Sequence, residues 1–231
     1  ACYVSGLLLT AMISTTARSA AQRAHSPLRD LIEGLVYVWR TPHIQAGMWL
    51  ACLVNLTAFP LTNALLPYVA RNIYQIDQTG LGMLVASFAF GALLGSIVLA
   101  LVRRAVPSGR LMIAASLVWH ALLLAFAHTT TQAAGMALLV LAGFAQSLSM
   151  LSLALMLLRT SQPHIRGRVM GVRMLAIYSL PIGLTVAGSL IPMFGYPATA
   201  SGYAILGIVL TVLIGWFWRR SVIAPGGAAN A

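Results

Sequence analysis

The sequence predicts an all-α integral membrane protein with six transmembrane helices and part of a seventh at its N-terminus. Two observations lead to this fold class. Hydrophobic residues make up 60% of the chain and charged residues only 7%, whereas soluble domains carry about 25% charged residues. The basic residues are all arginines, and they fall in clusters separated by long apolar stretches. A chain with so little charge uses the lipid bilayer as its solvent.

The arginine clusters predict the topology. Counted between successive apolar stretches, they number 4, 1, 3, 0, 4, 0 and 2. Because cytoplasmic loops of membrane proteins carry the excess of basic residues, six crossings place thirteen of the fourteen arginines in the cytoplasm, with the C-terminus. The same rule explains the net charge of +11 without a nucleic-acid partner.

The N-terminal part of the chain divides in two. Residues 1–17 are apolar and no basic residue precedes them, which is unlike a signal peptide. We interpret them as the end of a truncated transmembrane helix, and the chain as a fragment of a longer protein. Residues 18–43 form a cytoplasmic linker.

Within this linker, Ser26 and Pro27 form a good helix start, and Pro42 is a stop. The intervening segment predicts an amphipathic helix on the membrane surface. Its apolar side consists of Leu28, Leu31, Ile32, Leu35, Val36 and Trp39.

The region 44–220 holds the six predicted spans, since a helix needs about 20 apolar residues to cross a bilayer. They are Ile44–Pro67, Leu81–Val102, Leu111–Ala127, Gln132–Leu158, Met174–Phe194 and Pro197–Trp218. Residues 221–231 follow as a cytoplasmic tail.

The spans form two triplets that enter the membrane from opposite sides, which indicates a 3+3 inverted repeat. The first helix of each triplet carries amides, and the second carries pairs of small residues that let helices approach closely in lipid. These glycine pairs are Gly91 with Gly95, and Gly183 with Gly188. Transporters are often built from such repeats, with the substrate path between them.

Four segments resemble major facilitator transporters. Residues 28–42 resemble the linker into the seventh helix of that family, Gly80 to Gly95 the eighth helix, and Pro163 to Gly171 the loop between the tenth and eleventh. Pro181 to Gly183, with Gly188, resembles the eleventh helix.

This resemblance implies the C-terminal half of a twelve-helix transporter, similar to the branch that contains the bacterial enterobactin exporter. It also implies a small-molecule substrate, a missing N-terminal half as partner, no cofactor, and a place in the bacterial inner membrane.

Two stripes of residues are candidates for the wall of a substrate pathway. Asn55, Phe59 and Thr62 share one side of the first span, with Asn63 close by and Pro60 as a potential kink. Gln146 and Ser149 share one side of the fourth span with Gly143 and Leu153. The resemblance implies that these two helices line the central pathway. The alternative is hydrogen bonding between helices.

Charged residues near the cytoplasm are candidates for a gate. Family members often have an acidic residue in the loop after the second helix of each half, but Val102 to Arg110 contains none. Asp30 and Glu33 are the only acids on the predicted cytoplasmic side, and we expect them to contact an arginine in one state of the cycle. The candidate arginines of this gate are Arg103, Arg104, Arg110, Arg166 and Arg168. The alternative is that these arginines only anchor the loops.

The remaining polar residues suggest no metal or catalytic site. His120 lies in the middle of the third span, where the resemblance implies a lipid-facing helix. It is either a proton relay or, more typically, a packing residue. Cys2 and Cys52 fall in apolar segments without metal-ligand spacing.

The sequence therefore predicts a secondary active transporter that exports a small amphipathic molecule, of the drug or siderophore type, by alternating access. Proton antiport is implied by the family, although no span contains a carboxylate. The alternatives are a self-contained six-helix permease subunit that dimerises or joins a partner, and an intramembrane enzyme. No GxSxG motif supports the enzyme.

Overall fold

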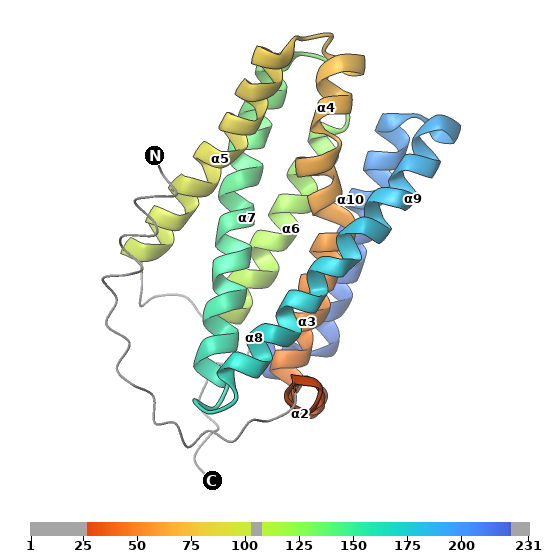
Figure 1. The fold of residues 1–231 in the computed structure, drawn as a ribbon. Coiled ribbons are helices and arrows are strands. Elements are labelled where there is room, and N and C mark those ends of the chain that lie inside the picture. Colours follow the sequence, from red (N-terminus) through yellow and green to blue (C-terminus); the bar gives the residue numbers. More distant parts are fainter. Residues whose placement is uncertain (1–26, 103–107, 223–231) are drawn as a thin grey trace.

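The computed structural model describes residues 27–102 and 108–222, and all of its regular elements are helices (Figure 1). The helices are α2 (Pro27–Arg40), α3 (Pro42–Phe59), α4 (Leu66–Tyr68), α5 (Gln78–Leu101), α6 (Ser108–Phe126), α7 (Gln132–Thr160), α8 (Arg166–Leu175), α9 (Ser179–Phe194), α10 (Tyr196–Phe217) and α11 (Arg219–Val222). Two π-helical segments (Pro60–Ala64 and Val69–Ile73) and a 3₁₀ turn (Ala176–Tyr178) join some of them. The predicted helix end 1–17, residues 18–26 of the predicted linker, and residues 223–231 of the predicted tail 221–231 lie outside the described residues.

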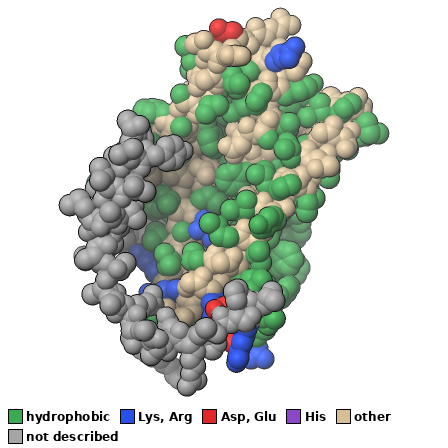
Figure 2. All heavy atoms as spheres, viewed as in Figure 1, with side chains coloured by type: hydrophobic (Ala, Val, Ile, Leu, Met, Phe, Trp, Pro, Cys, Tyr) green, Lys and Arg blue, Asp and Glu red, His purple; other side chains and the backbone are tan. Residues whose placement is uncertain are grey.

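Six helical stretches of the described chain are long and apolar enough to cross a membrane, as the sequence predicted. They run alternately up and down the bundle, so α7 points opposite to α3 (Figure 1). Apolar side chains are spread along the visible sides of the bundle, and most of the visible basic side chains lie toward the end that holds α2 (Figure 2). This surface suits contact with lipid along the sides of the bundle.

The fifth span is longer than predicted, because its N-terminal boundary was wrong. It begins at Arg166, not at Met174, so the segment expected as a loop is the helix α8. Val169 and Val172 on α8 are buried, and α8 packs against α2. Residues 166–173 are helical because one side of them has α2 to pack on, which hydropathy alone does not reveal.

The first span is also longer than predicted, since it continues through Pro67 to Ile73. Pro60 starts a π-helical turn in which the Leu65 backbone N–H donates to the Pro60 carbonyl at 2.9 Å. Proline has no N–H and its ring clashes with the preceding turn, so the helix widens by one residue and continues. The expected disruption at Pro60 is therefore a π-bulge.

The helix α2 has the predicted bounds and lies across one end of the bundle (Figure 1). Leu31 and Leu35 are half-buried and Val38 is buried, whereas Ile32 and Trp39 are exposed. The apolar side is therefore only partly covered by α3 and α8. Pro42 is the first residue of α3, so it starts the next helix as well as ending α2.

Glycines allow the most extensive helix contact in the described bundle, between α5 and α7. A Cβ on Gly91 would clash with the Val140 carbonyl, and one on Gly95 would lie 2.7 Å from the Phe144 carbonyl. A Cβ on Gly143 would likewise clash with the Phe88 carbonyl. The two backbones touch because these three residues have no side chain.

The opposite end of the bundle is held by polar contacts between turns. Asp77 caps α5, accepting from the Gly80 N–H at 2.8 Å. The hydroxyls of Tyr74 and Thr129 are hydrogen-bonded. Burial raises the pKa of Tyr74 above its ordinary value, so its phenol stays protonated at neutral pH. These contacts fix the α3–α5 and α6–α7 connections beside each other.

Candidate functional site

The amides of the first span lie at different depths in the bundle. Asn55 on α3 is half-buried, and its Nδ2 donates to the Ala51 carbonyl of the same helix at 2.8 Å. Asn63, in the π-helical turn, is exposed, with Nδ2 3.4 Å from the Phe59 carbonyl. Both amides therefore bond to their own helix and to no other helix in the described structure.

Two other residues of this predicted stripe are turned into the protein. Thr62 is 1% exposed and its hydroxyl donates to the Ala58 carbonyl at 3.2 Å. The ring of Phe59 packs edge-on against Trp119 of α6, with centroids 5.2 Å apart. The stripe Asn55, Phe59 and Thr62 does not form one open wall.

The second predicted stripe divides in the same way. Gln146 on α7 is half-buried. Ser149 is fully buried, and its hydroxyl donates to the Met112 carbonyl of α6 at 3.2 Å. Gly143 faces α5. Ser149 thus makes the helix-to-helix bond that was the alternative interpretation, because its side of α7 packs on α6.

The charged residues of α2 and α8 meet directly. Arg168 places Nη2 2.7 Å from Asp30 Oδ1 and Nη1 2.6 Å from Glu33 Oε2. Glu33 also accepts from Arg29 Nε at 3.1 Å. The expected contact between the two acids and an arginine of this segment is present, and one guanidinium joins both acids.

Gly34 makes this contact possible. A Cβ at Gly34 would lie 3.0 Å from Val172 Cγ2 and 3.2 Å from the Arg168 carbonyl. Because Gly34 has no side chain, the two helices approach closely enough for Arg168 to reach the acids one turn apart on α2.

The other candidate gate arginines are placed differently. Arg166 donates from Nε to the Ser161 carbonyl at 3.1 Å, which caps the end of α7. Arg110 lies exposed in the first turn of α6. Arg103 and Arg104 lie outside the described residues.

The two members of the second glycine pair, Gly183 and Gly188, differ in how closely they are packed. A Cβ on Gly183 would clash with the Leu56 carbonyl of α3, and Tyr203 of α10 donates to the Gly183 carbonyl at 2.6 Å. Gly188 is exposed, and no atom lies within 4 Å of where its Cβ would be. The expectation of a packing contact at Gly188 is not met in this structure.

Sequence reasoning missed the pairing of His120 with Thr57. His120 is fully buried on a helix that the resemblance placed at the lipid-facing periphery, and it makes the packing contacts that were its more typical interpretation. Its Nε2 lies 2.9 Å from Thr57 Oγ1 on α3, and its Nδ1 lies 2.8 Å from the Ser116 carbonyl. The one signal in the sequence was a single histidine within a span. Its partner, Thr57, lies 63 residues away, and no sequence motif connects the two residues.

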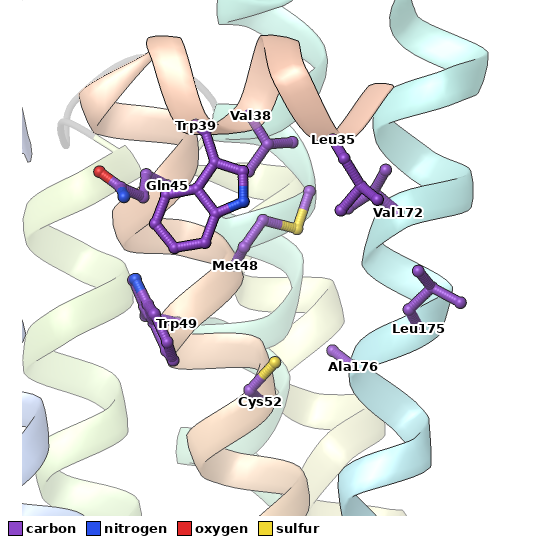
Figure 3. A pocket seen from close by; sticks show the side chains of 10 residues that line it. All are labelled: Leu35, Val38, Trp39, Gln45, Met48, Trp49, Cys52, Val172, Leu175 and Ala176. Carbon is purple, nitrogen blue, oxygen red and sulfur yellow. The ribbon is translucent and has the colours of Figure 1, made fainter. Parts of the chain in front are cut away.

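Two apolar hollows open between the helices. The first, about 200 Å³, lies between α2, α3 and α8, with Trp39 and Trp49 approaching edge to face at 6.2 Å (Figure 3). Cys52 lines it as a free thiol. The second, about 600 Å³, lies between α3, α9 and α10 and is bordered by Leu56, Thr57 and Tyr203. We call this second hollow the α9–α10 crevice.

The described residues contain no cluster of three histidine, cysteine or acidic side chains that would hold a metal ion. The polar groups near the middle of the spans are amides, hydroxyls and one imidazole. Such groups can bind an uncharged or cationic organic molecule, or a proton at the imidazole.

Comparison with known proteins agrees with this geometry. The family model of the Major Facilitator Superfamily matches residues 48–230. The chain is also similar to the multidrug efflux pump Tap of Mycolicibacterium fortuitum, with 27% identity over 193 residues. This alignment covers 80% of the chain and 45% of the pump. The chain therefore spans about half the length of that relative.

Proposed function

Since the chain belongs to the Major Facilitator Superfamily, we propose that it forms the C-terminal half of a secondary transporter that exports a small amphipathic molecule. The chain is a multi-pass membrane protein of the transporter class. The observation that carries the proposal is the family match over a bundle of six alternating spans. Alternating access then requires a second half, which supplies the other wall of the pathway.

The substrate is proposed from the relative and from the residues that remain accessible. The similar protein is named a multidrug efflux pump, and the middle of this half offers amides and aromatic rings without a carboxylate. Asn55, Asn63 and Gln146 retain exposed or half-buried amides. We assign the pathway role to these three amides. An amphipathic drug fits such a wall better than a strongly anionic siderophore, which remains the second candidate.

The energy source is proposed to be the proton gradient across the bacterial inner membrane, with the arginine-rich end of the bundle in the cytoplasm. The arginine distribution supports this orientation, because basic loops remain cytoplasmic. A self-contained six-helix permease and an intramembrane enzyme are weaker alternatives. No observation in the structure favours either over a transporter half.

The proposal is tested by ethidium efflux from cells that express the full-length transporter. We expect lower ethidium accumulation than in cells with an empty vector, and loss of the difference when a protonophore collapses the gradient. Equal accumulation with and without the transporter, at proven membrane abundance, would contradict a multidrug substrate range. Efflux that survives the protonophore would contradict proton coupling.

A further inference from the structure

The pairing of His120 and Thr57 has a hydrogen-bond pattern that depends on one proton. Thr57 Oγ1 lies 2.8 Å from the Leu53 carbonyl and 2.9 Å from His120 Nε2. His120 Nδ1 lies 2.8 Å from the Ser116 carbonyl. A carbonyl only accepts, so Nδ1 carries a hydrogen. The Thr57 hydroxyl has a single hydrogen to give.

That hydrogen has two possible acceptors. If it goes to the Leu53 carbonyl, then Nε2 must be protonated and donate to Thr57, and all three bonds form at once. If His120 is neutral, Thr57 must donate to Nε2, and the bond to the Leu53 carbonyl is lost. The full set of contacts is therefore satisfied by the imidazolium, and the Thr57 hydroxyl turns when the proton leaves.

The surroundings of the ring hold no other charged partner. The neighbours are Thr57 on α3, Ser116 and Trp119 on α6, and Gly207 on α10, where a Cβ would clash with the imidazole. The acids of the chain, Asp30, Glu33 and Asp77, lie outside the spans. The arginines of the described spans lie in the end turns or in α8. His120 is thus a side chain in the middle of a described span whose ordinary pKa lies near neutral pH.

The pair lies close to a hollow of the bundle. Thr57 borders the α9–α10 crevice of about 600 Å³, although the residue is itself only 1% exposed. Tyr203, which also borders the crevice, donates to the Gly183 carbonyl at 2.6 Å. The imidazole of His120 therefore lies one side chain behind the wall of this crevice.

We propose that His120 is a proton-binding residue of this transporter half and that Thr57 positions its proton. A proton bonds to the Nε2 lone pair, and the Thr57 hydroxyl turns from Nε2 to the Leu53 carbonyl. This inference rests on the proposed proton-coupled transport and supplies a binding site for the proton where no carboxylate is present. An ionisable side chain within a span is rare and usually functional.

The direct test is nitrogen NMR of the full-length transporter, labelled at histidine and held in lipid nanodiscs. The His120 signal is assigned by its loss in His120→Gln. We expect Nε2 to change from unprotonated to protonated as the pH is lowered from about 8 through the acidic range. The midpoint should be displaced in Thr57→Val and restored in Thr57→Ser, which keeps the hydroxyl. A His120 ring that stays in one neutral tautomer over this range would overturn the inference.

A transport test separates this inference from the proposed function. In proteoliposomes with an imposed pH gradient, wild type should move ethidium, and His120→Gln should lose this transport but keep exchange of ethidium without a gradient. His128→Gln is the matched control, because His128 is exposed and bonds to Ser201 at the end of the bundle. Gradient-driven transport that survives in His120→Gln overturns the inference alone. If wild type itself shows no gradient-driven transport of ethidium, proton coupling is overturned as well.

Discussion

Arg168 on α8 lies 2.7 Å from Asp30 on α2, and the same guanidinium contacts Glu33 at 2.6 Å. The side chains of Arg168 and Asp30 are 25% and 39% exposed, so water screens the pair. An exposed ion pair contributes about 0–1 kcal/mol. A contribution of this size still matters when two conformations differ by a few kcal/mol. The contact joins the linker helix to the fifth span, which makes it a candidate latch between states.

Replacement of both acids, Asp30→Asn with Glu33→Gln, should shift the balance between inward-open and outward-open states. The expected measurement is a distance distribution by electron spin resonance across the cytoplasmic face of the full-length transporter. The shift should shrink at high salt, because exposed charges are screened. Arg29→Gln is the control, since the contact of Arg29 with Glu33 stays within α2 and does not join it to α8. An unchanged distribution at low salt would leave these acids as solubility residues.

Labelling of single cysteines from outside the cell should define the orientation. Cysteines at Thr130 and Ala198 should react, and cysteines at Ser108 and His164 should not, in a background without native cysteines. Thr130 and Ala198 are exposed, whereas Tyr196 at the same end is buried and stacks on Tyr68, so it is a poor site. The reverse pattern of labelling would invert the topology.

Asn55→Leu and Gln146→Leu should each reduce ethidium efflux and leave membrane abundance nearly unchanged. Each change replaces a half-buried amide with an apolar side chain of similar size, and the Asn55 bond to its own helix is worth only about 1 kcal/mol. Asn72→Leu is the matched control, because Asn72 makes the same kind of bond to the Tyr68 carbonyl outside the middle of the bundle. If both variants transport normally, these amides are structural.

Gly91→Ala should destabilise the bundle, by about 1–3 kcal/mol. The new methyl group meets the backbone carbonyl of Val140, which cannot move aside as a side chain can. Gly188→Ala is the control, because open space surrounds that position and alanine favours a helix by about 1 kcal/mol over glycine. Thermal unfolding in detergent measures both. A melting temperature of Gly91→Ala equal to wild type would mean that α5 and α7 separate at no cost.

The sequence predicted the elements that depend on local chemistry. A proline start and an apolar spacing predicted α2 with its first residue, and hydropathy located all six spans. It also predicted that the acids of α2 would meet an arginine, because few acids were available. It could not predict α8 as a helix, since packing against other elements, α2 foremost, buries Val169 and Val172. Nor could it predict that Pro60 widens the helix into a π-bulge.

The tertiary structure decided which side of each span faces another helix. In a soluble protein the polar side of a helix faces water, so the pattern of residues indicates its orientation. In a bilayer the lipid is as apolar as the protein interior, so apolar residues point in every direction. The sequence alone therefore left Ser149 as a candidate for a pathway wall, and the resemblance placed the helix of His120 at the lipid-facing periphery. In the folded bundle Ser149 bonds to α6 and His120 bonds to Thr57 of α3, because those contacts satisfy polar groups that lipid cannot.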